Sequence, residues 1–125
     1  MRHTQRKGDT AVAQAVATFT KLGYDVSLPL TESAPYDLVV DTGAILKRVQ
    51  VKYSTNGEVD LRRVHSNAQG YVVKKPKKGV YDWLYVLKGN SSEEFLLIDC
   101  PFGRRSIKPT ARYYIQRVLK NGGVA

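Results

Sequence analysis

The segment APYDLVVDTGAILKRVQVKYST, Ala34 to Thr55, decides the fold prediction. It holds two stretches rich in β-prone residues, DLVV and ILKRVQVKYS, separated by the turn sequence DTGA. This arrangement predicts a β-hairpin. The second arm carries Arg48, Gln50 and Lys52 at alternate positions, which gives the strand one polar face. A polar face is typical of a solvated sheet, but it also agrees with a functional site, so both interpretations stay open at this point.

Strand parity connects Asp37 with that polar face. Residues directly opposite each other in an antiparallel pair point to the same face. A two-residue turn would place Asp37 opposite Arg48, and a four-residue turn would place it opposite Gln50. In either register Asp37 shares a face with Arg48, Gln50 and Lys52, whereas an odd loop length or a bulge would break this relation.

The whole chain, residues 1–125, predicts a single mixed α/β domain, because 125 residues suffice for one core. Apolar residues recur at helical spacing between residues 9 and 22 and predict a helix there. Asp9 or Thr10 would cap this helix, and Gly23 would end it. The apolar positions in question are Val12, Val16 and Phe19.

Further apolar stretches predict the remaining elements. Strands are expected at residues 24–30, in the two hairpin arms, and at 81–89 and 94–101, with a last helix at about 110–120. Residues 55–79 are polar and read as a loop with a short strand at 71–74. The order helix, three strands, loop, two strands, helix predicts a mixed central sheet flanked by helices.

The charge balance indicates a polyanionic partner. Twenty Lys and Arg against eleven Asp and Glu give a formal net charge of +9, which is typical of nucleic-acid-binding proteins, with a merely soluble basic protein as the alternative. Tyr53 and Ser54 carry hydroxyls that could contact a phosphate where the second arm ends, although an ordinary strand exit explains them equally well. The basic residues expected near a phosphate backbone are Arg6, Lys7, Arg48, Arg62, Arg63, Lys74, Lys75, Lys77 and Lys78.

The sequence argues against several classes of protein. No apolar run approaches the roughly 20 residues that span a bilayer, and the basic N-terminus lacks the apolar core of a signal peptide. The single cysteine, Cys100, excludes an internal disulfide and a Cys-cluster metal site. We therefore expect an intracellular protein, cytoplasmic or nucleoid-associated and not secreted, without a membrane partner.

The polar face combines a carboxylate, an amide and an ammonium group. Hard divalent cations take oxygen ligands such as the first two, and complete their shell with water and substrate phosphates. A neighbouring lysine can stabilise an oxyanion or orient a water nucleophile. These are the groups that phosphodiester hydrolysis requires, but a QxK sequence is also common on solvated strands.

The segment PYD, separated by twelve residues from QVK, resembles the PD-(D/E)xK nuclease motif. The similarity is greatest to small group I intron-type homing endonucleases of that superfamily, which carry Gln at the D/E position. It extends over about the first 55 residues, through RKGDTAVAQAV, LGYDVSLPL, APYDLVVD and LKRVQVKYST.

This resemblance implies a restriction-endonuclease-like core of αβββαβ-like order and a metal-dependent endonuclease for double-stranded DNA. Asp37 and Gln50 would be ligands of Mg²⁺ (or Mn²⁺), and Lys52 would be the catalytic lysine. The similar enzymes suggest a homodimer or homotetramer. Archaeal-type Holliday junction resolvases share the fold and the KG signature, so a nuclease for branched DNA is one alternative. A catalytically impaired DNA-binding module is another.

One departure from the superfamily concerns the first helix. Members often carry a Glu a few residues after KGD, where this chain reads TAVA, with Val12 at or near that position. With Gln50 neutral, Asp37 is then the only assigned carboxylate. Asp9 is a candidate accessory metal ligand, with a helix cap as its other interpretation; Asp41 or a DNA phosphate could also contribute.

Overall fold

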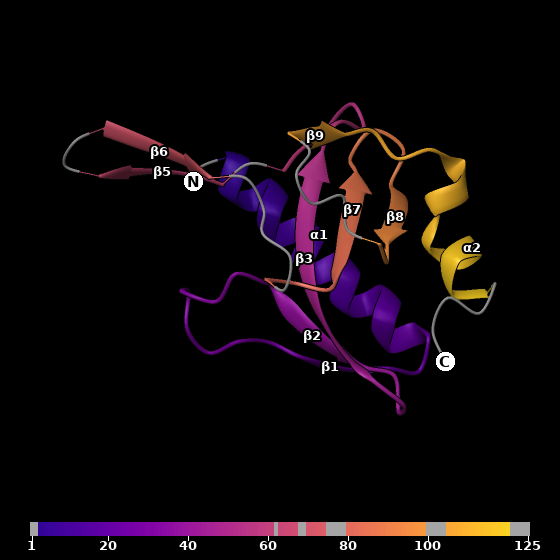
Figure 1. Ribbon diagram of the computed structural model, residues 1–125. Coiled ribbons are helices and arrows are strands. Elements are labelled where there is room, and N and C mark those ends of the chain that lie inside the picture. The colour runs from indigo at the N-terminus through magenta and orange to yellow at the C-terminus, as the bar shows by residue number, and fades with distance from the viewer. Residues whose placement is uncertain (1–2, 62, 68–69, 75–79, 100–104, 121–125) are drawn as a thin grey trace.

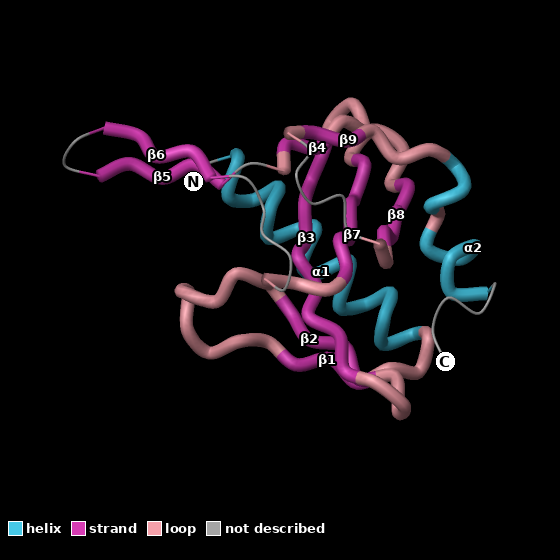
Figure 2. The backbone as a smooth tube through the Cα atoms, viewed as in Figure 1, coloured by secondary structure: helices cyan, strands magenta, loops and turns pink. Residues whose placement is uncertain are grey.

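The computed structural model describes residues 3–61, 63–67, 70–74, 80–99 and 105–120. Figure 1 shows a sheet crossed on one side by a long helix, with a short helix next to the last strand of the sheet. Figure 2 shows the same arrangement and a separate two-stranded ribbon that projects from the body. The elements are α1 (His3–Lys21), β1 (Asp25–Ser27), β2 (Leu38–Asp41), β3 (Leu46–Ser54), β4 (Val59–Asp60), β5 (Arg63–Asn67), β6 (Gly70–Lys74), β7 (Trp83–Lys88), β8 (Glu93–Leu97), β9 (Ser106–Ile107), the 3₁₀ helix η1 (Ala111–Tyr113) and α2 (Ile115–Lys120).

The main sheet is mixed, as the sequence predicts. Its strand order is β1-β2-β3-β7-β8, and every pair is antiparallel except β3–β7, which is parallel. A parallel pair needs a crossover connection. Here the described part of that crossover contains β4, β5 and β6 and no helix, so the crossover helix of the expected αβββαβ-like order is absent from it.

Helix α1 begins earlier than the sequence pattern predicts. It starts at His3, so Asp9 and Thr10 lie inside the helix and the predicted cap is wrong. The Thr10 hydroxyl instead donates to the Arg6 carbonyl at 2.8 Å. The predicted end is confirmed, because Gly23 has a φ of 89°, a left-handed conformation that suits glycine.

Small residues let α1 lie close to the sheet. Ala11, Ala15 and Phe19, at i, i+4 and i+8, are fully buried against it. The predicted contact positions Val12 and Val16 are only partly buried and border this core.

Strand β7 lies at the centre of the core and is buried on both faces. Trp83 and Tyr85 pack on the α1 side, and Leu84 and Val86 pack on the opposite side. This explains the continuous apolar run WLYVL, which is typical of a strand covered on both faces.

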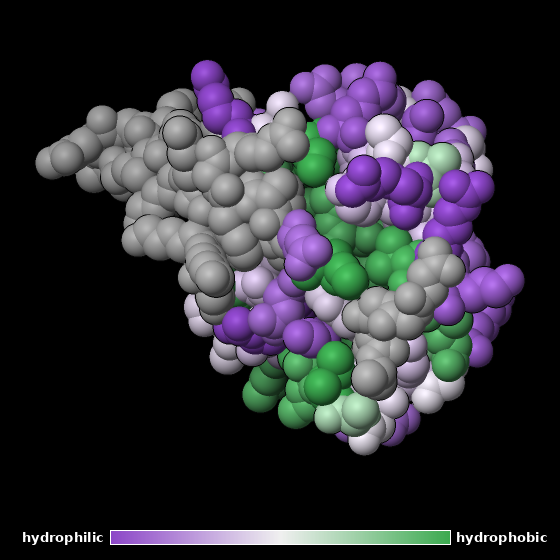
Figure 3. Space-filling model, turned by 45° about the vertical axis from the view of Figure 1, so that its right-hand side comes forward, coloured by the Kyte–Doolittle hydropathy of each residue, from purple (hydrophilic) through white to green (hydrophobic). Residues whose placement is uncertain are grey.

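On the face visible in Figure 3, apolar surface lies between areas of hydrophilic side chains. Within the described residues, no helix is long and apolar enough to cross a membrane.

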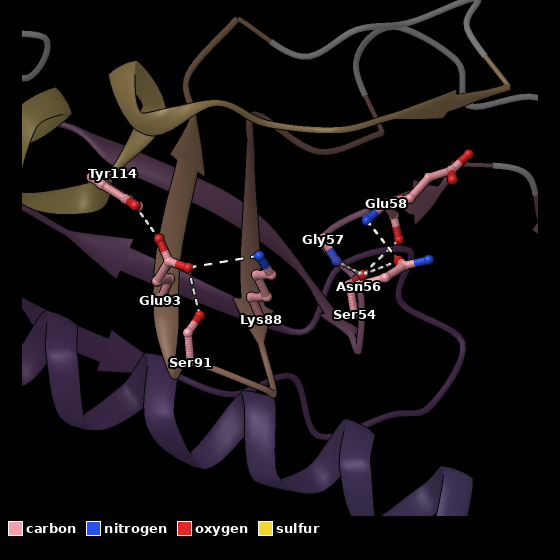
Figure 4. Close-up of polar contacts among 8 residues, drawn as sticks. All are labelled: Ser54, Asn56, Gly57, Glu58, Lys88, Ser91, Glu93 and Tyr114. Atoms are coloured by element: carbon pink, nitrogen blue, oxygen red, sulfur yellow. Dashed lines mark hydrogen bonds and ion pairs between the residues drawn. The ribbon is translucent and has the colours of Figure 1, made fainter.

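The C-terminal segment is attached to β8 through Tyr114. Its ring stacks on Phe95 with a centroid distance of 5.2 Å, and its hydroxyl donates to Glu93. Figure 4 shows Glu93 in contact with Lys88 and Ser91 as well. The burial of Ile115 completes the contact and places α2 at the β8 edge of the sheet.

The chain between β1 and β2 forms a loop rather than a continued strand. Strand β1 ends at Ser27, whereas the sequence predicts a strand that reaches residue 30. Pro29 has no N–H to donate to a neighbouring strand, and Leu30 is 99% exposed. The loop therefore lies at the protein surface beside the start of β2.

Candidate active site

The β2–β3 turn has four residues, which selects one of the two predicted registers. Leu38 pairs with Val49, and Asp41 pairs with Leu46. The Asp41 carboxylate accepts a hydrogen bond from the Gly43 N–H at 2.8 Å, and Gly43 has a φ of 93°. Asp37 directly precedes this paired segment, and its N–H donates to the carbonyl of Val49, the residue that is already paired with Leu38. The register therefore does not continue to an Asp37–Gln50 pair.

Two hydrogen bonds hold Asp37 against β3. Its N–H donates to the Val49 carbonyl at 2.8 Å, and its Oδ2 accepts from the Val51 N–H at 2.8 Å. Asp37 therefore bonds the two residues that flank Gln50, Val49 through its backbone and Val51 through its carboxylate. Among the described residues, its Oδ1 accepts no hydrogen bond.

The alternation of β3 places Gln50 and Lys52 on one face. Val49 and Val51 are buried on the α1 side, whereas Gln50 and Lys52, the residue after each of them, are half-buried. On the parallel neighbour, Gln50 pairs with Leu84, whose side chain belongs to the core on the side opposite α1. The alternation predicted for β3 therefore agrees with the observed strand pairing, and the position of the Asp37 side chain on that face stays a prediction.

Burial and charge act in opposite directions on Asp37. Burial raises the pKa of its carboxyl, while the Val51 N–H and the positive charge of Lys52 lower it, and the net pKa is raised. The effect of Lys52 on this pKa shows that the ammonium group is near enough to act on the carboxylate. A further positive charge beside Asp37 would offset the cost of its burial.

The oxygen donors at this place suit a hard cation. The Asp37 carboxylate and the Gln50 amide oxygen are the types that Mg²⁺ binds, and Mg²⁺ usually takes its other ligands from water and substrate phosphate. Within the described residues no group of three or more His, Cys, Asp or Glu is placed to hold a metal. The donors therefore fit a cation that relies on substrate oxygens rather than an all-protein cage.

A surface groove of about 380 Å³ borders Asp37. Val12 of α1 contributes to its wall, which is the helix position where the superfamily resemblance leads one to expect Glu. The other lining residues come from the β1–β2 loop and its end: Leu28, Pro29, Leu30, Thr31, Glu32, Ala34 and Tyr36. Asp9 is exposed on α1 and does not line this groove.

Arg48, a predicted DNA contact, has a partner within the protein. Asp82 accepts hydrogen bonds from the Arg48 N–H at 2.9 Å, from Nε at 3.1 Å and from Nη2 at 3.2 Å. The Arg48 hydrogen bond keeps the pKa of Asp82 below its usual value. Arg48 thus joins β3 to the residue before β7. Because its guanidinium group is bound to Asp82, the structure gives no support to the predicted contact between Arg48 and DNA.

Ser54 is also used within the protein. It is 5% exposed, donates to the Glu58 carbonyl at 2.7 Å and accepts from the Gly57 N–H at 2.8 Å. Figure 4 shows these contacts, together with that of Asn56, in the turn after β3. This placement favours the strand-exit interpretation of Ser54 over a phosphate contact.

Lys7 and Tyr53 lie together on the α1 side of the sheet. The Lys7 Nζ is 5.8 Å from the Tyr53 ring centroid, and Tyr53 packs beside the core of that side. Both residues are therefore on the face opposite Gln50 and Lys52.

The remaining predicted DNA contacts are only partly described. Arg6 lies in α1, and Arg63 pairs with Lys74 in the β5–β6 ribbon. Arg62, Lys75, Lys77 and Lys78 lie outside the described residues. Sequence reasoning missed Asp82, whose signal was an acidic residue directly before the apolar run of β7.

Comparisons with known proteins agree with this geometry. A family model described as PD-(D/E)XK endonuclease matches residues 2–100. Among solved structures, a bacterial homing endonuclease, I-Ssp6803I, is similar with a TM-score of 0.80 and 26% sequence identity, over 98% of this chain and 97% of that chain. No curated protein matches the chain. The restriction-endonuclease-like fold class predicted from the sequence is confirmed.

Proposed function

Because this chain belongs to the PD-(D/E)XK endonuclease family, we propose that it is a Mg²⁺- or Mn²⁺-dependent endonuclease that hydrolyses phosphodiester bonds in double-stranded DNA. One observation carries the proposal. The Asp37 carboxylate accepts the N–H of Val51, which lies between Gln50 and Lys52 on β3, and the positive charge of Lys52 lowers the pKa of that carboxyl. The proposal therefore groups a carboxylate, an amide and an ammonium group at one site, in the residue types of the family motif.

Each residue has a distinct role in this proposal. Asp37 and Gln50 hold the metal ion through their side-chain oxygens. The ion supplies Lewis acidity, which favours an attacking hydroxide and polarises the phosphate. Lys52 orients the water nucleophile and stabilises the negative charge that develops on the phosphate oxygens. The buried neighbours Val49 and Val51 fix the strand, so that both polar side chains keep their places.

Charge and shape support DNA as the substrate. The net charge of +9 favours binding to a phosphate backbone. The β5–β6 ribbon projects from the body (Figure 1), and a two-stranded ribbon of this kind fits the major groove. Arg63 and Lys74 form the pair at its base. Likeness to a homing endonuclease supports a homing-endonuclease-like activity. A homodimer or homotetramer is part of the proposal through the sequence resemblance alone.

Plasmid cleavage tests this function. We expect the wild-type chain to cut supercoiled plasmid with Mg²⁺ or Mn²⁺ and to lose activity in EDTA. Asp37→Asn and Lys52→Ala should each lower the cleavage rate by at least about a hundredfold, while a gel-shift assay shows DNA binding retained. Lys47→Ala is the matched control, because it removes a lysine from the other face of β3 and should leave cleavage unchanged.

Other outcomes would identify the alternatives. Salt-sensitive DNA binding without cleavage in either metal would contradict the enzyme and indicate a DNA-binding module. Cleavage of a four-way junction with its matched linear duplex left intact would indicate a junction resolvase instead.

A further inference from the structure

The proposed metal site has little negative charge. A divalent ion beside Asp37 would meet one carboxylate, a neutral amide at Gln50 and the positive charge of Lys52. The strength of oxygen-ligand cation sites depends on how many charged ligands they contain. The helix position that resembles the Glu site of the superfamily holds Val12, and its side chain lines the groove next to Asp37.

A loop residue that lines the same groove offers a carboxylate. Glu32 lies on the loop between β1 and β2, five positions before Asp37, and lines the same groove as Val12 and Asp37. Its side chain is exposed, and it forms no hydrogen bond or ion pair within the part of the chain that the structure describes. A glutamate in this situation is free to turn toward a cation.

Other acidic residues near the hairpin are less suitable. Asp41 lies at the far end of β2, where its carboxylate accepts the Gly43 N–H. Asp9 does not line the Asp37 groove, and Glu58 lines a different one with Asn56. Glu32 is therefore the acidic residue that shares a groove with Asp37.

We propose that Glu32 is the second carboxylate ligand of the divalent ion and takes the place of a helix glutamate. The β1–β2 loop, rather than α1, then supplies this ligand. The inference rests on the proposed function, since it concerns the ion that the function requires. The rest of the coordination shell would come from water and the scissile phosphate.

Mn²⁺ binding to the full chain, measured by electron paramagnetic resonance titration without DNA, tests the inference apart from activity. Glu32→Gln should weaken Mn²⁺ binding by about tenfold or more. Glu58→Gln, which removes the same charge from another exposed loop, should change it by less than about twofold. Adding Val12→Glu to Glu32→Gln should restore most of the affinity, because Val12 lines the same groove.

The outcomes separate this inference from the proposed function. If Glu32→Gln binds Mn²⁺ as well as wild type while Asp37→Asn does not, Glu32 is not a ligand and the proposed function stands. If Asp37→Asn also binds like wild type, the site itself is misplaced and the proposed function fails with it. A double variant that melts like wild type but gains no affinity over Glu32→Gln would contradict the shared groove.

Discussion

At the residue scale, the surroundings of Asp37 favour the protonated form of its carboxyl group over the charged form. Its carboxyl is partly buried, and burial outweighs the Val51 hydrogen bond and the charge of Lys52, so that its pKa is raised. In the proposed function, activity needs the charged carboxylate, whereas stability favours its neutral form, an opposition that is common at active sites. A carboxylate kept in this way is better suited to binding a cation than to stabilising the fold.

Asp37→Asn should stabilise the protein at neutral pH. A raised pKa means that the folded state binds this proton more tightly than the unfolded state, whose pKa is near the ordinary value of 3.8. The carboxylate therefore destabilises the fold above its raised folded pKa, and this penalty disappears as the pH falls below the unfolded value. Urea denaturation at pH 7.5 should show a gain of about 0.5–1 kcal/mol for the variant, discounted for partial exposure.

The same comparison near pH 3.5 should show little difference between Asp37→Asn and wild type. Asp25→Asn, an exposed carboxylate on β1, is the control and should change the free energy of unfolding by less than about 0.5 kcal/mol at either pH. A loss of stability in Asp37→Asn at pH 7.5 would show that the Val51 contact outweighs burial.

At the scale of elements, the Arg48–Asp82 pair joins β3 to β7. The two side chains meet in a forked contact, and the backbone adds two bonds, one in each direction, between the same residues. The parallel pairing of β3 with β7 begins directly after this contact, at Val49 and Trp83. The pair therefore fixes the register of the strand that carries Gln50 and Lys52.

Arg48→Ala should destabilise the fold without weakening DNA binding. The expected loss is about 1–2 kcal/mol, because Asp82 then lacks the guanidinium partner of a forked, half-buried ion pair. Because Arg48 lowers the Asp82 pKa, this stabilisation is present above pH 3.8 and is lost as the pH falls through the lowered folded value. Urea denaturation at pH 7 and near pH 2.5 measures both effects, with Lys21→Ala, an exposed lysine at the end of α1, as the control. Unchanged stability with reduced DNA affinity would instead support a phosphate contact by Arg48.

The sequence predicted the face of β3 that carries Gln50 and Lys52 because that prediction needed only local information. A period of two along β3 places these two residues together, and the place of Asp37 beside them stays a prediction. The register itself depended on whether the turn has two or four residues, and the pairing of Asp41 with Leu46 shows that it has four. The family resemblance then assigned chemistry to a face that residue types alone left ambiguous.

Other features of the fold could not be predicted, because the local pattern of apolar and polar residues carries no information about them. Residues 3–8 have no apolar periodicity, so the early start of α1 left no trace in the sequence pattern. The partner of Arg48 lies 34 residues away, and no spacing rule connects the two. Strands β4 to β6 occur in a polar segment where only residues 71–74 have a strand-like pattern. The placement of Glu32 next to Asp37 follows from a loop, and loops have no periodicity to read.

At the scale of the whole molecule, the proposed function requires that one active site per chain account for the cleavage of two DNA strands. A monomer would cut one strand and would then have to dissociate or reorient before it could cut the other. Nicked plasmid would therefore accumulate as an intermediate. An assembly that places one site on each strand would cut both within a single binding event. A two-fold axis through such an assembly would match the symmetry of near-palindromic DNA.

Mixing wild type with inactive Lys52→Ala distinguishes these routes. If two chains cut as a unit, wild type alone should produce linear plasmid with little nicked intermediate. Pre-mixing wild type with a tenfold excess of Lys52→Ala should place most wild-type chains in mixed assemblies, each with one working site, and shift the product to nicked circles. Lys52→Ala keeps the Asp37 contact with Val51, which does not involve the lysine, so the variant should still fold, assemble and bind. Free accumulation of nicked circles by wild type alone, with a product ratio that the excess of Lys52→Ala does not alter, would show that each chain cuts independently.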